Sequence, residues 1–299
     1  MDGILPLWKP KGMTSHDCVM KIRKLAQTKK VGHTGTLDPE VEGVLPICIG
    51  QATKIVPFLT DTRKTYIAEL SLGTATDTED SQGEVIAFKE MTRQFSYDEI
   101  EKTLQKFKGE ITQIPPMYSA VKVNGRKLYE YARNNIPVER PKRKVNIYEL
   151  RQILDENMDD HHISLKIVCS KGTYIRTLCV NIGEALGFPA HMSSLVRTKT
   201  GAFSEKDTVQ FDMLEKAAAA NELQTMLLPI AAGLEHLDTL EADETMRKRV
   251  LHGQKISEPK KAMHTDPFKI MYENKLLAIY QIHPEHDDVI KPVRVFNEK

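Results

Sequence analysis

Within one short stretch of the chain, the spacing of apolar residues changes from a period of two to a helical period. Residues 163–169, ISLKIVC, alternate between apolar and polar positions, which is typical of a β-strand with one buried face. After the turn SKGTY, apolar residues recur at helical spacing from Ile175 to Leu186, and Gly187 follows as a helix stop signal. The chain must therefore pack sheet and helices together, with Arg176 near a helix N-terminus beside a glycine turn.

The same patterns predict three further elements. Residues 65–73 alternate as a second strand. A capping box formed by Ser96 and Glu99 begins a helix that Gly109 is expected to end. Ser15 can cap another helix, which is rich in basic residues and precedes a glycine-rich loop.

The last part of the chain changes character. The stretch KIMYENKLLAIYQI predicts two strands around Glu273 and Asn274, and VIKPVRVF predicts a third. At 299 residues the chain exceeds one average domain, so we expect a large α+β domain followed by a small, mostly β domain that begins near residue 239.

Composition limits the class of protein. No run of apolar residues is long enough for a membrane span, and the N-terminus lacks the features of a signal peptide, so we expect a cytoplasmic protein. The four cysteines form no C-x-x-C pair and have no close histidine partner, so we expect reduced, largely buried thiols.

The net charge of +1 hides a strongly uneven distribution. Residues 9–30 and residues 122–144 each carry a local balance of +6, whereas residues 205–245 carry −8. Basic blocks of this kind are typical of proteins that bind a polyanion such as RNA, although solvated charged faces would look the same. The segment 118–145 also contains tyrosines, so it could clamp a nucleic acid or be a surface hairpin.

Sequence motifs argue against several enzyme classes. The chain has no phosphate-binding P-loop, no dinucleotide-binding glycine pattern, no H-E-x-x-H and no G-x-S-x-G. Of the histidines, His161 and His162 are adjacent and would point to opposite faces of a strand, while His283 and His286 lie in a polar segment. We therefore expect no metal site.

The loop VGHTGTLDPEVEGVLP, residues 31–46, offers a carboxylate for chemistry. Asp38 precedes Pro39, which limits it to extended conformations, and the glycines of the loop would let the backbone approach a bulky ligand. A carboxylate held in this way suits a nucleophile or a general base. Asp-Pro is also a common turn dipeptide, so the loop alone does not decide between a catalytic residue and a turn residue.

Five motifs together indicate a family. The segments KPKGMTS (9–15), GHTGTLDPEVEGVLP (32–46), KTYIAEL (64–70), CSKGTYIRTL (169–178) and LVRTKTGAF (195–203) occur in an order and spacing that resembles the TruB family of bacterial tRNA pseudouridine synthases. These enzymes make pseudouridine at position 55 in the T loop of tRNA. The resemblance runs from the N-terminus to about residue 235.

The resemblance implies catalytic roles for three residues. Asp38 matches the catalytic aspartate, which is thought to attack uracil C6 or ribose C1′ or to act through a glycal intermediate. Tyr66 matches the tyrosine that stacks on the flipped base and can take a proton. Arg176 matches the arginine that pairs with the aspartate, and such a partner is expected to lower the pKa of Asp38. Without the motifs, Tyr66 would be a core residue and Arg176 equally a phosphate contact.

The resemblance also implies four binding or supporting residues. His33 matches the histidine that fills the place of the flipped uridine, and without the motif it would be a surface histidine. Tyr174 and Leu195 match residues that line the uracil pocket. Lys9, in the KP element, is expected to support the active-site loop rather than to react.

The implied fold is the α+β pseudouridine synthase fold, a mixed and largely antiparallel sheet with flanking helices. Residues 1–238 would form the catalytic domain, 118–145 an RNA-clamping thumb, and 239–299 a PUA-like RNA-binding domain. The reaction is an isomerisation that needs no cofactor or metal. We expect tRNA as the partner, no membrane or guide RNA, and a monomer.

Three alternatives remain open at this point. A non-catalytic RNA-binding protein or tRNA-folding chaperone would use the basic blocks but not Asp38. A relative that acts only in a guide-RNA complex would share the motifs, although the insertion 118–145 favours recognition of tRNA by the protein alone. An aspartate-dependent hydrolase of small substrates is disfavoured by the two basic blocks.

Overall fold

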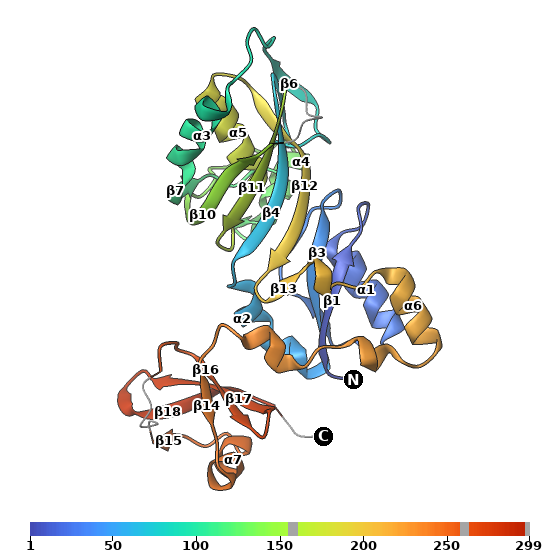
Figure 1. Ribbon diagram of the computed structural model, residues 1–299, viewed down its shortest axis with the longest axis vertical. Coiled ribbons are helices and arrows are strands. Elements are labelled where there is room, and N and C mark those ends of the chain that lie inside the picture. The colour runs from blue at the N-terminus through green and yellow to red at the C-terminus, as the bar shows by residue number, and fades with distance from the viewer. Residues whose placement is uncertain (155–160, 258–262, 297–299) are drawn as a thin grey trace.

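The computed structural model of the protein describes residues 1–154, 161–257 and 263–296. A nine-stranded sheet with flanking helices forms the larger part, and a five-stranded sheet forms the C-terminal part (Figure 1). In these ranges no helix is long and apolar enough to cross a membrane. All four cysteines are free and buried, as predicted.

The nine-stranded sheet has the strand order β1-β3-β12-β4-β11-β10-β7, with β2 paired to β3 and β13 paired to β12. Its strands are β1 (Gly3–Lys9), β2 (Val31–His33), β3 (Glu42–Ile49), β4 (Lys64–Leu72), β7 (Gly109–Gln113), β10 (Arg143–Ile153), β11 (His162–Cys169), β12 (Ala190–Thr200) and β13 (Phe203–Ser204). The pairing of β3 with β12 is parallel, and the other pairings of this sheet are antiparallel. The predicted mixed, largely antiparallel sheet is therefore confirmed.

Helices cover the sheet in two groups (Figure 1). The helices are α1 (Ser15–Leu25), α2 (Val56–Thr60), α3 (Tyr97–Leu104), α4 (Leu128–Arg133), α5 (Ile175–Leu186), α6 (Phe211–Ala219) and α7 (Glu244–Leu251). Short 3-10 turns occupy Gly50–Ile55, Gln105–Phe107, Glu205–Asp207, Leu223–Met226 and Ile230–Leu234. Helices α3 and α5 share an apolar core with β4, β10, β11 and β12. Helices α1 and α6 share a second core with β1, β2 and β3.

Strands β4 and β11 and helix α5 lie where the spacing of apolar residues predicted them. Strand β4 alternates between buried and partly exposed residues along its whole length, and β11 leads through a turn into α5. Gly187 ends α5 in the left-handed conformation, with a φ of 86°. Lys64 and Tyr66, two residues apart, therefore lie on the buried face of β4, which packs in the core shared with α3 and α5.

Two details of the helix ends differ from the sequence predictions. The N-cap of α1 is Thr14 rather than Ser15, because Thr14 and Asp17 form a capping box that satisfies the first turn. The capping box of Ser96 and Glu99 begins α3 as predicted. Gly109 does not end that helix, which stops at Leu104 and continues as a 3-10 turn; Gly109 instead opens β7.

The insertion 118–145 contains the two-stranded hairpin β8 (Lys122–Val123) and β9 (Arg126–Lys127), followed by α4. A second small hairpin, β5 (Thr74–Thr76) and β6 (Val85–Phe88), extends from the end of β4 (Figure 1).

The C-terminal sheet has the order β14-β16-β17-β18-β15. Its strands are β14 (Thr239–Glu241), β15 (Ile256–Ser257), β16 (Phe268–Tyr272), β17 (Lys275–His283) and β18 (His286–Val295). The predicted turn at Glu273 and Asn274 is confirmed, with φ values of 46° and 64° that suit a two-residue hairpin turn. Ile279 and Phe296 join an apolar cluster with residues of the larger part. The division at residue 239 and the PUA-like type stay predictions.

Gly43 fixes how closely β3 and β12 approach each other. It is paired with Arg197 in the parallel register and has a φ of +124°. A Cβ atom at this position would lie 2.2 Å from the carbonyl oxygen of Arg197. The glycine is therefore required by a neighbouring strand of the protein, whereas the sequence suggested that it made room for a ligand.

We expect Gly43→Ala to lower the free energy of unfolding by about 3 kcal/mol or more, because it combines a left-handed backbone with a backbone clash. Gly187→Ala is the control: its φ is also positive, but no atom lies within 4 Å of the added Cβ. The control should cost about 1 kcal/mol. Denaturant unfolding checks both values, and equal losses in the two variants would contradict the clash.

Candidate active site

A cavity of about 300 Å³ opens in the larger part of the molecule, at the ends of β4, β11 and β12. The loop 34–41, the loop 170–174 and the first turn of α5 form its walls, together with residues at the beginning of the insertion. Five of the residues singled out in the sequence line this cavity. They are Asp38, Tyr66, Tyr174, Arg176 and Leu195.

Asp38 and Arg176 form an ion pair in this cavity. Oδ2 of Asp38 lies 3.1 Å from Nη2 of Arg176, which α5 projects from its first turn. The arginine side chain is 8% exposed, whereas the aspartate side chain is 43% exposed. The carboxylate can therefore be reached from the cavity while its partner is fixed inside the protein.

The guanidinium of Arg176 has partners in two further segments. Nη1 donates to the carbonyl oxygen of Thr78 at 2.9 Å and lies 3.4 Å from Oδ2 of Asp80. Nη2 also donates to the carbonyl oxygen of Tyr118, at 2.9 Å, where the insertion begins. No motif identified Asp80 in the sequence. Its partner Arg176 lies far along the chain, so only the tertiary structure shows the contact.

The pKa of Asp38 is raised above its ordinary value, so the lowering expected from Arg176 is present but outweighed. Removal of the carboxylate from water by the surrounding protein is the largest cause. The Arg176 charge does lower the pKa, but the nearby Asp80 carboxylate raises it. Arg176 thus orients the aspartate and only partly offsets the cost of ionising it in the cavity.

Two side chains from outside the cavity hold the loop that carries Asp38. Nζ of Lys9, which is fully buried, donates to the carbonyl oxygens of Pro10, Pro39 and Val41 at 2.8, 3.0 and 2.6 Å. The Ser15 hydroxyl accepts a hydrogen bond of 2.9 Å from the backbone N–H of Leu37. This geometry suits the supporting role expected for Lys9. It also explains why Ser15 is not the helix cap.

Arg197 holds the same loop from the sheet side. It is the largest fully buried side chain of the described residues, and it lies opposite Tyr66 in the pairing of β12 with β4. Its Nε donates to the carbonyl oxygen of Val44 at 2.8 Å, and its Nη2 donates to that of Gly35 at 3.3 Å. Arg197 was not among the residues predicted for the site, although it lies in the motif LVRTKTGAF.

The two tyrosines of the cavity are held in different ways. Burial raises the pKa of Tyr66, and a side-chain hydrogen bond with Arg197 partly opposes this rise. The buried amide of Gln113 exchanges two hydrogen bonds with the backbone of Tyr174, at 3.1 and 3.0 Å. Gln113 therefore fixes the start of α5, and only the tertiary structure shows this.

His33 ends β2 and does not line the cavity. Its Nδ1 accepts a hydrogen bond of 3.4 Å from the backbone N–H of Gly35, and burial lowers its pKa, which favours the neutral ring. An added Cβ would lie 3.5 Å from Nη1 of Arg197 at Gly35 and 3.7 Å from the Val56 side chain at Gly32, and both are ordinary contacts. Within the protein, neither Gly35 nor Gly32 is therefore required by a close approach.

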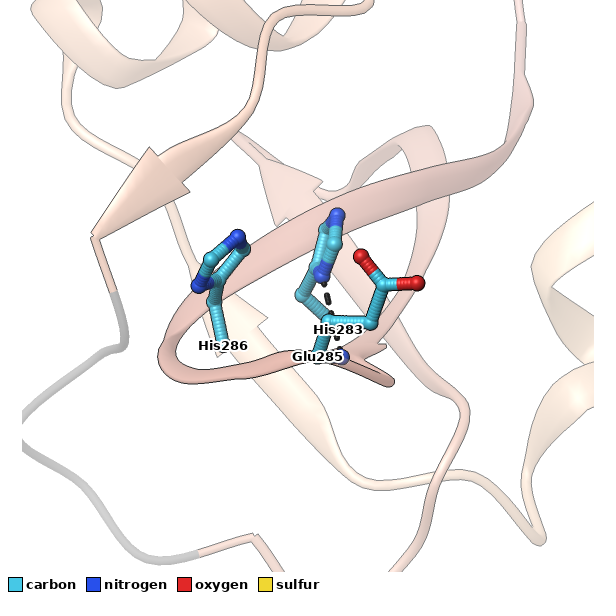
Figure 2. A group of neighbouring side chains, drawn as sticks. All are labelled: His283, Glu285 and His286. Atoms are coloured by element: carbon cyan, nitrogen blue, oxygen red, sulfur yellow. Dashed lines mark hydrogen bonds between the residues drawn. The ribbon is translucent and has the colours of Figure 1, made fainter.

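One possible group of metal ligands occurs among the described residues, at the turn between β17 and β18 (Figure 2). Figure 2 shows His283 between His286 and the carboxylate of Glu285. Nδ1 of His283 accepts a hydrogen bond of 3.2 Å from the backbone N–H of Glu285, and Nε2 lies 3.0 Å from Nζ of Lys255. Both ring nitrogens thus have other partners, and nearby lysine charges disfavour a cation. This group does not fit a metal site.

Two family models match the chain consecutively. The model described as TruB family pseudouridylate synthase, N-terminal domain, matches residues 23–175. The model described as tRNA pseudouridylate synthase B, C-terminal domain, matches residues 176–235. The matched residues include Asp38, Tyr66, Tyr174, Arg176 and Leu195.

Several curated proteins are similar over almost the whole chain. The tRNA pseudouridine synthase B of Oceanobacillus iheyensis is 61% identical over 297 residues, covering 99% of this chain and 98% of that protein. The protein of the same name from Listeria innocua is 51% identical, with the same coverage. One from Staphylococcus aureus is 48% identical and covers 99% of each chain.

Two solved structures share the fold. A chain of an H/ACA RNP bound to a substrate RNA containing 2′-deoxyuridine superposes with a TM-score of 0.75 at 25% identity, covering 99% of this chain and 85% of that chain. A chain of a Cbf5–Nop10–Gar1 complex superposes with a TM-score of 0.74 at 29% identity, covering 99% and 84%.

We expect two substitutions beside Asp38 to move its pKa in opposite directions. Asp80→Asn removes a negative charge and should lower the pKa, whereas Arg176→Met removes the positive partner and should raise it. Carbon-13 NMR titration of the aspartate carboxyl groups, assigned with Asp38→Asn, measures both shifts. Asp61→Asn, at an ion pair on the rim, is the control and should leave the pKa unchanged. Shifts of the same sign would contradict the electrostatic account.

Proposed function

The chain belongs to the TruB family of pseudouridylate synthases, and we propose that it converts uridine to pseudouridine at position 55, in the T loop of tRNA. It is an enzyme of tRNA modification, an isomerase that acts on uridine. The observation that carries the proposal is the ion pair of Asp38 and Arg176 at the wall of a cavity that can hold a pyrimidine base.

The reaction explains why a single carboxylate can be the reactive group. The bond from ribose C1′ to uracil N1 breaks, the base turns, and a new bond forms from C1′ to C5, so no atom is gained or lost. Asp38 acts as the nucleophile, on ribose C1′ or uracil C6, or acts through a glycal intermediate. We expect no cofactor. A cavity that excludes water holds the detached uracil near the ribose while this happens.

The remaining cavity residues bind the flipped base. Tyr66 lies under the cavity on β4 and stacks on the uracil, and its phenol can take a proton during the rearrangement. Leu195, on the neighbouring strand β12, forms an apolar wall, and Tyr174 provides polar contact. Because Gln113 and Arg197 hold these elements, the base meets groups that are already in place.

Residues around the cavity support the RNA and the loop. His33, next to the loop that carries Asp38, fills the place that the flipped uridine leaves in the T loop. Lys9 fixes the loop through three carbonyl groups and does not take part in the chemistry.

The insertion 118–145 acts as a clamp on the tRNA. Its hairpin exposes Lys122 and Arg126, and the Tyr129 ring lies near the cationic groups of Lys127 and Arg133, at 5.3 and 5.2 Å. Cations and an aromatic ring on one small surface suit contacts with phosphates and bases. The C-terminal part, residues 239–299, serves as a PUA-like RNA-binding domain beside the catalytic domain 1–238.

The enzyme acts alone, as a monomer in the cytoplasm. The superposed chains come from an H/ACA RNP and from a complex with Nop10 and Gar1, whereas the similar curated proteins are named as tRNA-modifying enzymes. The insertion gives this chain its own basic surface for RNA, which supports recognition of tRNA without a guide.

We expect the purified wild-type protein to form pseudouridine in an unmodified tRNA transcript without any other component. Asp38→Asn should bind the same transcript with unchanged affinity and form no pseudouridine, because the amide is not a nucleophile at this site. Nucleoside analysis after digestion and a filter-binding assay provide the two readouts. Activity in Asp38→Asn would remove the catalytic role of the carboxylate, and a need for guide RNA would remove action by the protein alone.

We expect the double substitution Lys122→Gln and Arg126→Gln to weaken tRNA binding and to reduce its salt dependence. The slope of log K against log salt should become shallower by about 0.7 to 0.9 for each phosphate that the variant no longer neutralises. Lys216→Gln, on the exposed side of α6 within the acidic segment, is the matched control and should not change the slope. An unchanged slope in the double variant would exclude this hairpin from the RNA-binding surface.

A further inference from the structure

The cavity contains a buried lysine that the proposed function leaves without a role. Lys64 begins β4, two residues before Tyr66, and is only 6% exposed. Its Nζ donates hydrogen bonds to the carbonyl oxygens of Thr60 and Thr62. An ammonium group has three N–H donors, so one donor remains without a partner among the described residues.

Lys9 provides a direct comparison. Its ammonium group is also buried, but it donates to three backbone carbonyl oxygens and so uses all its donors in holding a loop. Lys64 lines the cavity and Lys9 does not. The two buried lysines therefore differ in the one property that matters for a ligand, which is a free donor at the cavity wall.

No carboxylate of the described residues forms an ion pair with Lys64. Asp61, the acidic residue of the adjoining loop, is paired instead with Lys171 at the cavity rim, at 2.8 Å. The other groups that face Lys64 are Arg197 from β12 and the Cys169 thiol from β11. Two buried cations, Lys64 and Arg197, thus lie beside one cavity, which favours a ligand that carries or develops negative charge.

Every route open to this reaction places negative charge on the uracil ring. When the N1–C1′ bond breaks, its electron pair stays with N1 and is shared with the carbonyl oxygens O2 and O4. When the carboxylate instead adds to C6, the charge develops as an enolate on O4. When C5 joins C1′, the new bond uses this electron pair and the ring is neutral again. A base then takes the proton from C5 and N1 gains a proton, so the product has the same atoms as the substrate. A fixed positive charge beside the ring would lower the energy of each of these anions.

We propose that Lys64 is a further catalytic residue, whose ammonium group stabilises the negative charge that the uracil ring carries between its detachment and its reattachment. The proposal rests on the proposed function. The base, rather than a phosphate, is the group that Lys64 meets, because the flipped base enters the cavity whereas phosphates stay outside it. A lysine suited to phosphate would be exposed like Lys171 on the rim, whose side chain is 56% exposed.

Burial lowers the pKa of Lys64 to about 8, and the Arg197 charge adds to this effect. Lys64 is therefore charged below about pH 8 and loses its charge above it. Burial raises the pKa of Cys169 to about 11 and also raises that of Tyr66, so neither group titrates near pH 8. The pKa of Lys9 is lowered too, so the test must separate the two lysines by substitution.

The test measures kcat and kcat/KM for pseudouridine formation in the tRNA transcript between pH 6 and pH 9.5, together with tRNA affinity. In the wild type the rate should fall as the pH rises through about 8. Lys64→Met should lower the rate by about 100-fold at pH 7 and remove this fall, with unchanged tRNA affinity. Lys64→Arg should recover most of the rate and keep it up to pH 9.5, because a guanidinium stays charged.

Lys166→Met is the matched control, since Lys166 lies on β11 in an ion pair with Glu149 and does not line the cavity. It should keep the wild-type rate and pH profile. Thermal unfolding of each variant reports any loss of fold, and a merely structural role of Lys64 would lower stability without removing the fall above pH 8.

A wild-type rate without a fall near pH 8, or a Lys64→Met variant that keeps this fall, would overturn the proposal while leaving the proposed function intact. Weaker tRNA binding with an unchanged rate at saturation would make Lys64 a phosphate contact and would also overturn it. Absence of pseudouridine in the wild-type reaction would overturn the proposed function and the role of Lys64 with it.

Discussion

The site depends on the hydrogen bonds and ion pairs that the guanidinium of Arg176 makes. The guanidinium contacts the loop of Asp38, the turn that carries Thr78 and Asp80, and the beginning of the insertion at Tyr118. These segments are far apart in the sequence, and no other described side chain joins all of them. A planar group with five fixed donors can hold several acceptors in one geometry, which a lysine could not do. The position of α5 therefore decides where the carboxylate lies.

The sequence predicted elements whose cause is local. The alternation in β4, the change of period from β11 to α5 and the turn between β16 and β17 depend on neighbouring residues, and all are confirmed. The residues that line the cavity were predicted from family motifs. The motifs indicate which residues come together but give no physical reason for their positions. Asp80 and Gln113 could not be found because their partners are distant along the chain. Arg197 lies in a motif, but the motif alone did not indicate its role. Ser15 was misplaced because a hydroxyl can serve a helix cap or a tertiary contact equally well.

Buried cations hold most of the site in place, and backbone carbonyl oxygens are their main partners. Lys9, Lys64 and Arg197 each donate to carbonyl groups of the loops around the cavity. Removing these charges from water is costly, so the carbonyl partners are needed to satisfy them. The loops are thereby fixed mainly through backbone carbonyl groups. Asp38 and Asp80 are the two carboxylates that form ion pairs with Arg176.

The shared guanidinium also links the insertion to the chemistry. The carbonyl oxygen of Tyr118 accepts from the same Nη2 atom that contacts Asp38, and Gln113, at the end of β7, is bonded to the backbone of Tyr174. A shift of the segment 113–118 would therefore move acceptors of the groups that orient the carboxylate. Since the insertion follows this segment directly, its position and the orientation of Asp38 cannot be independent. A displacement of the insertion and the orientation of the Asp38 carboxylate are thus linked through two side chains, Gln113 and Arg176.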